Sequence, residues 1–517
     1  MKKTWLRIAL AAACVAGLTA CSEGFGYYFD ADRYSELQGA ICPVEPAPGE
    51  EGDQFEAFTD NPFVKTAVEP VSTFSVDADG ASYAVMRNYL TKGFEINRQS
   101  VRIEEFLNYF TFDYPEPTDG NAIAINAEAG PCPWNAAHRL LRLGIKGKSI
   151  DKGAMPQANF VFLVDVSGSM EGEDRLDLLK SGLTRLLTEL NPDDRISLIT
   201  YSGEVRKVLE STPVRQATKI TKAIKGLKAN GSTAGGKALE MAYQEALANY
   251  SPALNNRIIM GTDGDFNVGV TNTDSLVAMV ERYARKGIYM TCLGFGMGNF
   301  NDAMMEHISN AGNGTFSYID CENEMMKVFV HERERFLSVA SDTKCQVTFD
   351  STLVSAYRLI GYENRVMANE DFEDDTKDAG EIGAGQTITA LYEIVPAAAF
   401  PHYDPSNRRV FATFDCRYKS SLGASSHPLK VDVAVEDMYE VDCWNNDISL
   451  KPASENLRFA AGVAAYGMML RQSPYKGEAS YGMARQLVSD ALSFDPHGYR
   501  AELLSLMEKA EAIKKEQ

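Results

Sequence analysis

One carboxylate and two hydroxyls, Asp165, Ser167 and Ser169, stand two residues apart directly after a mostly apolar run at 159–164. That run is typical of a buried strand, and Gly168 is predicted to let the chain turn sharply at its end. Such a turn can aim the three side chains at one point. Oxygen ligands suit a hard cation such as Mg²⁺ or Ca²⁺ better than zinc or copper. Because Asp, Gly and Ser are common in turns, this spacing alone is a weak signal.

Two further oxygen donors follow at comparable places in the chain. Thr233 lies in a glycine-rich loop at 230–236, before a predicted helix at 237–249, and Asp263 lies at the carboxyl end of an apolar strand within 258–264. Their order after strand ends predicts that they join the first three residues around one cation. The alternative is a set of unrelated strand-end turns.

This arrangement resembles the von Willebrand factor A domain, whose metal-ion-dependent adhesion site uses D-x-S-x-S, a threonine and an aspartate. The resemblance implies that Ser167, Ser169 and Thr233 bind Mg²⁺ (or Ca²⁺ or Mn²⁺) through their hydroxyls. It also implies that Asp165 and Asp263 act largely through water or hydrogen bonds. Three hydroxyls leave the coordination shell unfinished, so a carboxylate from a protein partner is the expected last ligand.

The region around these residues is predicted to be an α/β domain. Strands and helices alternate from about 157 to 335, which indicates a doubly wound, mainly parallel sheet covered by helices on both faces. Ligands of such folds bind at the carboxyl ends of the strands. The predicted strands are 159–164, 196–201, 258–260 and 288–295, and the predicted helices are 175–190, 237–249 and about 274–285.

Both flanks of this domain show the period-two pattern of half-buried strands. Residues 122–127 and 139–145 supply too few strands to bury a sheet alone, whereas the region 345–435 supplies about five. We therefore expect one antiparallel β-sandwich built from both flanks, with the strand at 140–145 paired to a strand of 345–435. The α/β domain would be inserted with its ends close together, away from the metal. Three C-terminal helices follow at 457–470, 481–492 and 500–513.

Short sequence motifs outside the A domain resemble those of a family of Gram-negative lipoproteins that carry this domain. They include Asn61-Pro-Phe-Val64, Val101-Arg-Ile-Glu-Glu105, Asn108-Tyr-Phe110 and Pro131-Cys-Pro-Trp134. The region at 101–110 is predicted to be an amphipathic helix, with Arg102, Glu104 and Glu105 on a solvated or ion-paired face. Trp134 is predicted to be a packed loop anchor.

The N-terminus has the features of a targeting signal. Lys2 and Lys3 precede an apolar segment at 6–18, which is too short to span a membrane as a mature helix. It ends at Leu18-Thr-Ala-Cys21, which resembles a lipobox and implies cleavage before Cys21 and acylation of that cysteine. Several acyl chains anchor a protein durably. The resemblance to Gram-negative lipoproteins implies the cell envelope of such a bacterium, at the outer membrane, on either its periplasmic or its surface face. The predicted organisation is a signal peptide at 1–20, a flexible tether at 21–57, an N-terminal flanking domain at 58–152, the A domain at 157–335, the β-sandwich at 336–450 and C-terminal helices at 451–517.

Composition and cysteine content disfavour two classes of function, nucleic-acid binding and zinc binding. The chain has 517 residues, enough for about three domains, and a net charge of −20, which disfavours binding to nucleic acid. Removing Cys14 and acylating Cys21 leaves seven of the nine cysteines, an odd number without a zinc-binding motif. Cys292 is predicted to be a core residue, and a Cys416–Cys443 disulfide is one alternative that sequence cannot decide.

Catalysis and nucleotide binding find little support. No G-x-S-x-G surrounds the two serines and no histidine lies in the three predicted metal loops. The glycines at 294–298 lack the full dinucleotide-binding spacing and are predicted to form a tight loop beside the metal. The leading hypothesis is a lipid-anchored, cation-dependent module that binds an acidic side chain of a protein partner. The alternatives are an envelope scaffold in which metal only orders the loops, and, more weakly, a metal-dependent hydrolase.

Overall fold

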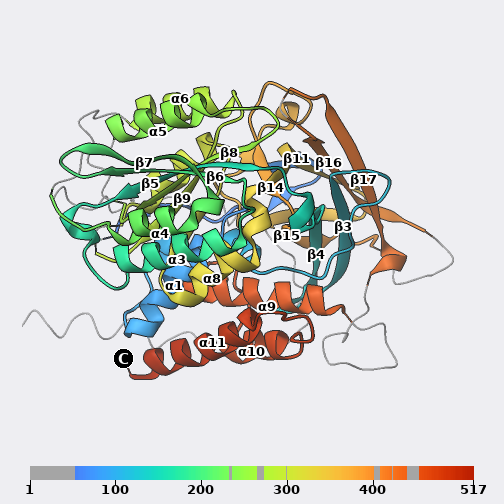
Figure 1. The fold of residues 1–517 in the computed structure, drawn as a ribbon. Helices are drawn as coiled ribbons and strands as arrows, with labels where there is room; N and C mark the ends of the chain where they lie inside the picture. The colour runs from blue at the N-terminus through green and yellow to red at the C-terminus, as the bar shows by residue number, and fades with distance from the viewer. Residues whose placement is uncertain are drawn as a thin grey trace, which may run out of the picture. The chain divides into compact units, whose positions relative to one another are not determined.

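A computed structural model describes residues 53–231, 236–264, 273–298, 300–400, 408–421, 423–438 and 453–516 (Figure 1). The signal peptide, Cys21, Thr233, Cys443 and most of the predicted tether lie outside these ranges. All described residues belong to one compact unit.

The predicted α/β domain is built on a six-stranded sheet with the order β10-β9-β8-β5-β6-β7. All neighbours are parallel except β6 and β7, which are antiparallel. The doubly wound, mainly parallel fold is thus confirmed, with β7 and β10 as additional edge strands. The strands are β5 (Ala158–Asp165), β6 (Arg195–Tyr201), β7 (Val205–Pro213), β8 (Asn255–Thr262), β9 (Tyr289–Phe295) and β10 (Phe316–Ile319).

Helices cover both faces of this sheet because alternate residues of each strand point to opposite sides. On β5, Val161 and Leu163 enter one core, whereas Phe162 and Val164 enter the other. The first core is closed by α5 (Gly236–Ala248), α6 (Thr273–Ala284), α7 (Asp302–Ala311) and α1 (Ala81–Lys92), and the second by α3 (Leu176–Glu189), α4 (Ala217–Lys225) and α8 (Glu322–Met326). Figure 1 shows α5 and α6 on the opposite side of the sheet from α3 and α4. Helix α1 comes from the N-terminal flank, so the A domain does not close its own core alone.

The two flanks build a shared β-sandwich, as the strand patterns predicted. Strand β4 pairs antiparallel with β15, from Arg139 opposite Ile394 to Lys146 opposite Thr387. Buried side chains from both sheets fill the space between them. One sheet has the order β1-β12-β15-β4-β3 and the other β13-β2-β11-β16-β17, with β14 also paired to β11. Their bounds are β1 (Val64–Lys65), β2 (Val71–Ser75), β3 (Ile123–Cys132), β4 (Asn135–Gly147), β11 (Ser338–Phe349), β12 (Val354–Ile360), β13 (Val366–Met367), β14 (Gly380–Gly383), β15 (Thr387–Pro396), β16 (Val410–Lys419) and β17 (Ser426–Ala434).

The two ends of the inserted domain meet at Asn255, the first residue of β8. Its backbone N–H donates to the Gln157 carbonyl at 2.9 Å, and its side-chain amide donates to the Phe336 carbonyl at 3.0 Å. Asp165 and Asp263 lie at the opposite, carboxyl ends of β5 and β8. The chain therefore enters and leaves the A domain on the side away from these carboxylates, as predicted.

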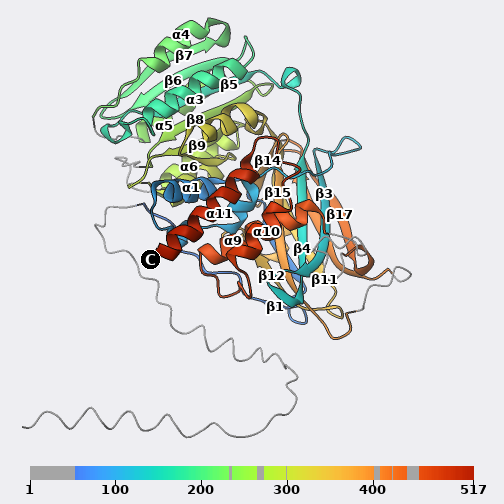
Figure 2. The same cartoon turned by 90° about the horizontal axis from the view of Figure 1, so that it is seen from below.

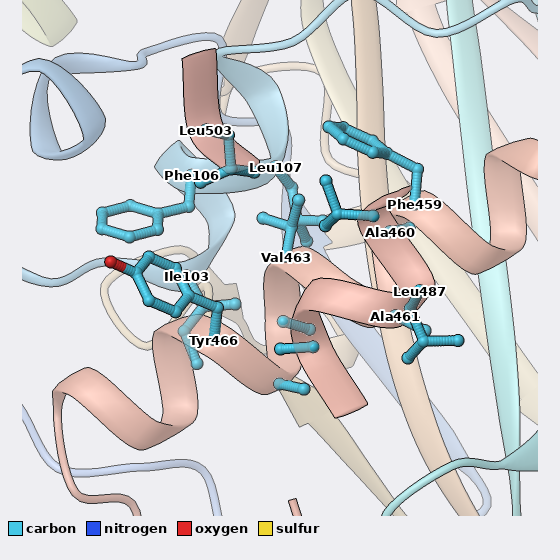
Figure 3. Close-up of a cluster of buried hydrophobic side chains, with 14 of the residues drawn as sticks. Ile103, Phe106, Leu107, Phe459, Ala460, Ala461, Val463, Tyr466, Leu487 and Leu503 are labelled. Atoms are coloured by element: carbon cyan, nitrogen blue, oxygen red, sulfur yellow. The ribbon is translucent and has the colours of Figure 1, made fainter. Parts of the chain in front are cut away.

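Helices cover the outer face of the sandwich sheet β1-β12-β15-β4-β3, the face turned away from the other sheet (Figure 2). The side chains of Leu140 in β4 and Leu391 in β15 point to this face and pack in one core with side chains of the helices. Figure 3 shows Phe106 and Leu107 packed with Val463, Tyr466 and residues of neighbouring helices. These helices are α2 (Ile103–Asn108), α9 (Glu455–Leu470), α10 (Tyr481–Ser489) and α11 (Tyr499–Glu516).

The predicted solvated face of α2 is instead buried. Arg102, Glu104 and Glu105 expose at most 4% of their surface. The Arg102 guanidinium forms ion pairs with Glu105 at 2.9 Å, with Asp302 at 3.1 Å and with Glu306. Arg102 thus joins Glu105 to α7 of the A domain, whereas Glu104 lies against Gly361 of the C-terminal flank. Of the predicted alternatives, solvated or ion-paired, the structure shows ion pairing for Arg102 and Glu105.

Candidate metal centre

The predicted aspartate and both serines lie together in a tight turn at the end of β5. The Ser167 N–H donates to Asp165 Oδ1 at 2.8 Å, and the Ser167 and Ser169 Oγ atoms are 2.9 Å apart. The turn is a 3₁₀ segment at Gly168–Met170, and Gly168 has no positive φ. The sharp turn therefore does not depend on the conformational freedom of glycine at 168, which corrects that prediction.

Neighbouring strands fix the position of this turn. The Val166 N–H donates to the Tyr201 carbonyl at the end of β6, at 2.9 Å. The Asn230 N–H donates to the Val166 carbonyl at 2.7 Å, and the Gly168 N–H donates to the Gly231 carbonyl at 3.0 Å. Gly231 is the last described residue before the segment 232–235, which contains Thr233. The prediction for Thr233 itself falls outside the described residues.

The fourth predicted residue in the described part, Asp263, directly follows β8. Its neighbour Thr262 is fully buried and donates its hydroxyl to Asp165 Oδ2 at 3.0 Å. The next residue, Gly264, has φ +85°, and a Cβ there would lie 2.6 Å from the backbone N of Asn301. Glycine is therefore required at 264, because a larger residue would push the Asp263 loop off the neighbouring backbone.

Electrostatics link the two carboxylates. Burial raises the pKa of Asp165 to about 6, the N–H and hydroxyl of Ser167 act in the opposite direction, and the charge of Asp263 raises it again. A positive charge between two such carboxylates would favour their ionised forms.

The geometry of the donor atoms fits a small hard cation. The two serine hydroxyls form a hydrogen bond to each other, with their Oγ atoms 2.9 Å apart. Adjacent ligands of octahedral Mg²⁺, at 2.0–2.1 Å from the ion, have a similar separation, roughly 2.9 Å. Ser169 is half-buried and Gly168 is exposed, whereas Ser167 is buried, so the turn reaches the surface at Gly168 and Ser169. Among the described residues, no group of three or more His, Cys, Asp and Glu is arranged to hold a metal ion.

Several residues around this site could not be recognised from sequence. Thr262 could have been suspected only as the neighbour of Asp263. Arg175 donates from Nη2 to the Met297 carbonyl at 2.9 Å and from Nη1 to the Ser169 carbonyl. It thereby joins the serine turn to the glycine loop that follows β9, which lies beside the site as predicted.

No helix in the described ranges is both long and apolar enough to cross a lipid bilayer. The prediction of a lipid anchor concerns Cys21, which lies outside those ranges.

The doubly wound sheet with an oxygen-lined turn at its carboxyl edge defines a von Willebrand factor type A-domain protein, and the model of that domain matches residues 159–330. Two further family models match the flanks, "von Willebrand factor" at 49–142 and "Uncharacterized protein YfbK, C-terminal" at 334–513. The chain belongs to the YfbK family. It is 37% identical over 481 residues to "Uncharacterized protein YfbK" of Escherichia coli (strain K12), covering 89% of this chain and 81% of that protein.

More distant similarities concern smaller parts of the relatives. The human "Inter-alpha-trypsin inhibitor heavy chain H4" is 37% identical over 154 residues, which cover 28% of this chain and 16% of that protein. A solved structure of "von Willebrand factor type A from Catenulispora acidiphila" is 15% identical, covers 72% of this chain and 88% of that chain, and has a TM-score of 0.41. Domains of the A type commonly serve as protein-interaction modules.

Proposed function

We propose that this chain is a divalent-cation-dependent protein-binding module, held at the Gram-negative outer membrane by lipid on Cys21. Its site would bind an acidic side chain of a partner protein. The observation that carries this proposal is the pair of serine hydroxyls, 2.9 Å apart beside the buried carboxylate of Asp165.

Each residue of the site has a separate role in this proposal. Ser167 and Ser169 present hydroxyl oxygens to the cation, together with Thr233. Asp165 holds the serine turn through the Ser167 N–H and is itself held by the Thr262 hydroxyl. Asp263 adds negative charge from the next loop. Mg²⁺ bound there would supply a Lewis-acidic position for a partner carboxylate.

A scaffold is the second candidate, because the A domain is joined to its flanks by buried charges. Arg87 of α1 contacts Asp320 at 2.5 Å and Glu324 at 2.7 Å in the A domain, and Glu502 of α11 at 2.9 Å. In this function the metal would order the loops without contacting a partner.

Capture of partners from detergent-solubilised envelope, with Mg²⁺ and then with EDTA, separates the two functions. Binding by a partner carboxylate predicts a partner that is lost with EDTA and is not bound by Asp165→Ala. Asp177→Ala is the matched control, since Asp177 is an exposed carboxylate on α3. A partner that is retained with EDTA and by Asp165→Ala would favour the scaffold.

A further inference from the structure

Two fully buried cysteines face each other across the β-sandwich. Cys345 of β11 is directly opposite Cys416 of β16 in the antiparallel register, and neither exposes any surface. Both belong to the core between the sheets. Burial raises the pKa of the Cys345 thiol well above its usual value, and the adjacent Cys416 thiol raises it further.

The register brings these residues within the range of a disulfide. Directly opposed Cα atoms of antiparallel strands are about 4.5 or 5.5 Å apart, depending on the hydrogen-bonding position. Disulfides span Cα separations of about 4.4–6.8 Å. Opposed residues therefore meet the Cα separation that a disulfide requires in both hydrogen-bonded and non-hydrogen-bonded positions. Only a small local approach of the two Cβ atoms is needed.

We propose that Cys345 and Cys416 form a cross-strand disulfide when the chain folds in the presence of a disulfide oxidant. The thiolate of one cysteine attacks the oxidant's disulfide and releases one thiol. The thiolate of the second cysteine then attacks the mixed disulfide and releases the other thiol, so two cysteine protons end on the oxidant's sulfurs. Because both thiols are buried in the folded chain, the exchange precedes closure of the sandwich.

The test is to refold the reduced full-length chain with oxidised glutathione, block free thiols after unfolding, and map the peptides. The expected result is a Cys345–Cys416 cross-link. The two cysteines lie 71 positions apart in the chain, so reduction should lower the unfolding midpoint by about 5–10 °C. Cys416→Ser should abolish the cross-link and this shift.

The matched control is Cys292→Ser, because Cys292 is equally buried but has Met260 and Phe316 as strand neighbours. This variant should keep the cross-link. Alkylation of both Cys345 and Cys416 after refolding, or a cross-link from Cys345 to another cysteine, would overturn the inference.

A second, independent observation concerns the N-terminal arm. Asp53 and Gln54, predicted to belong to the flexible tether, are hydrogen-bonded to A-domain residues of the loop after β9, among them Gly298 and Phe300. Asp53 Oδ1 accepts from the Gly298 N–H at 2.6 Å and the Phe300 N–H at 3.1 Å. Its Oδ2 accepts from the Tyr89 hydroxyl at 2.7 Å.

The loop held by Asp53 contacts both halves of the candidate metal centre. On one side its Met297 carbonyl accepts from Arg175, which also holds the Ser169 carbonyl. On the other side the backbone at 300–301 lies against Gly264, the residue after Asp263. The loop therefore links the serine turn to the Asp263 loop.

We infer that Asp53 is a positioning residue for the metal centre, an inference that rests on the proposed function. Through the Gly298 and Phe300 amides, Asp53 fixes the loop that sets the distance between Ser169 and Asp263. Loss of these bonds should weaken cation binding without unfolding the chain, because Asp53 is only partly buried.

Titration calorimetry of the full-length chain with Mg²⁺ tests this role. Asp53→Ala should weaken Mg²⁺ binding about tenfold and lower the unfolding midpoint by only a few degrees, because the chain stays folded without these bonds. Asp53→Asn should recover most of the affinity, because its amide oxygen can still accept from both N–H groups.

Glu56→Ala is the control, as Glu56 is exposed on the same arm and lies 3.8 Å from His307. Equal Mg²⁺ affinity of wild type and Asp53→Ala would overturn the positioning role alone. Wild type that binds no Mg²⁺ would overturn the proposed function together with it.

Discussion

Thr262 shows how a single buried hydroxyl supports the candidate site. It donates to Asp165 Oδ2 at 3.0 Å and accepts from the Gly264 N–H at 3.2 Å, so it joins the two carboxylate loops. Thr262→Val keeps the shape of the side chain and removes both bonds. We expect Mg²⁺ affinity to fall about three- to tenfold, with a stability loss of about 1–2 kcal/mol. Titration calorimetry and urea unfolding measure the two effects.

The control for this substitution is Thr188→Val on α3, whose exposed hydroxyl donates to the Arg185 carbonyl at 2.7 Å. It should leave Mg²⁺ affinity unchanged. A Thr262→Val variant that binds Mg²⁺ as well as wild type would contradict the role of this hydroxyl.

The sequence was informative about the site only where the donors follow strands. The placement of Asp165, Ser167, Ser169 and Asp263 at one edge of the sheet could be predicted, because carboxyl ends of parallel strands share that edge; their role as metal ligands stays a prediction. The part played by Arg175 depends on a contact with Met297, 122 residues away. No local pattern encodes such a contact, and the same holds for Asp53.

At the scale of elements, the buried guanidinium of Arg102 joins α2 to α7. Burial opposes its charge, but the carboxylates of Asp302, Glu105 and Glu306 outweigh this effect and raise its pKa. Arg102→Met should destabilise the chain by about 3–5 kcal/mol, because it leaves the buried Glu105 and Glu306 without their positively charged partner. The midpoint of urea unfolding measures this loss. A loss below about 1 kcal/mol would show that the ion pairs of Arg102 do not hold α2 against α7.

The same cluster predicts a pH dependence. Burial raises the pKa of Asp302 to about 8, although Arg102 acts against this. The folded state therefore favours the protonated carboxyl. The protonated Asp302 carboxyl contributes its full stabilisation below its pKa in the unfolded chain, about 3.9. This stabilisation is lost as the pH rises through its folded-state pKa of about 8. We expect the free energy of unfolding to fall by about 2 kcal/mol between pH 6 and 9. Asp302→Asn should reduce this fall, and an unchanged pH profile would contradict the assignment.

The main elements could be predicted because their periodicity is strong. The strands of the A domain are apolar runs, and those of the flanks alternate. Strand β10 was missed because it has four residues, and β7 because most of its first residues are exposed and charged. The packing of α1 onto the A-domain sheet could not be predicted, since amphipathicity shows that a face is buried but not against which element.

At the scale of the whole molecule, the A domain and its flanks share cores and buried ion pairs. Ala84 and Val85 of α1 lie in the A-domain core, and Arg87 of the same helix pairs with both the A domain and α11. We expect a single cooperative transition in scanning calorimetry. The double variant Arg87→Met/Arg102→Met should separate it into two. Two independent transitions in the wild type would contradict this coupling.

The central claim is that the strand-end hydroxyls and carboxylates form a cation site for a partner's carboxylate. The most direct measurement is Mg²⁺-dependent partner capture by wild type, Asp165→Ala and Asp177→Ala, each with an unfolding curve. We predict capture by wild type and Asp177→Ala that EDTA abolishes, and none by Asp165→Ala, which should still fold but unfold at a midpoint a few degrees lower, because Asp165 is buried and accepts from Ser167 and Thr262. Equal capture by all three proteins, with and without EDTA, would contradict the claim.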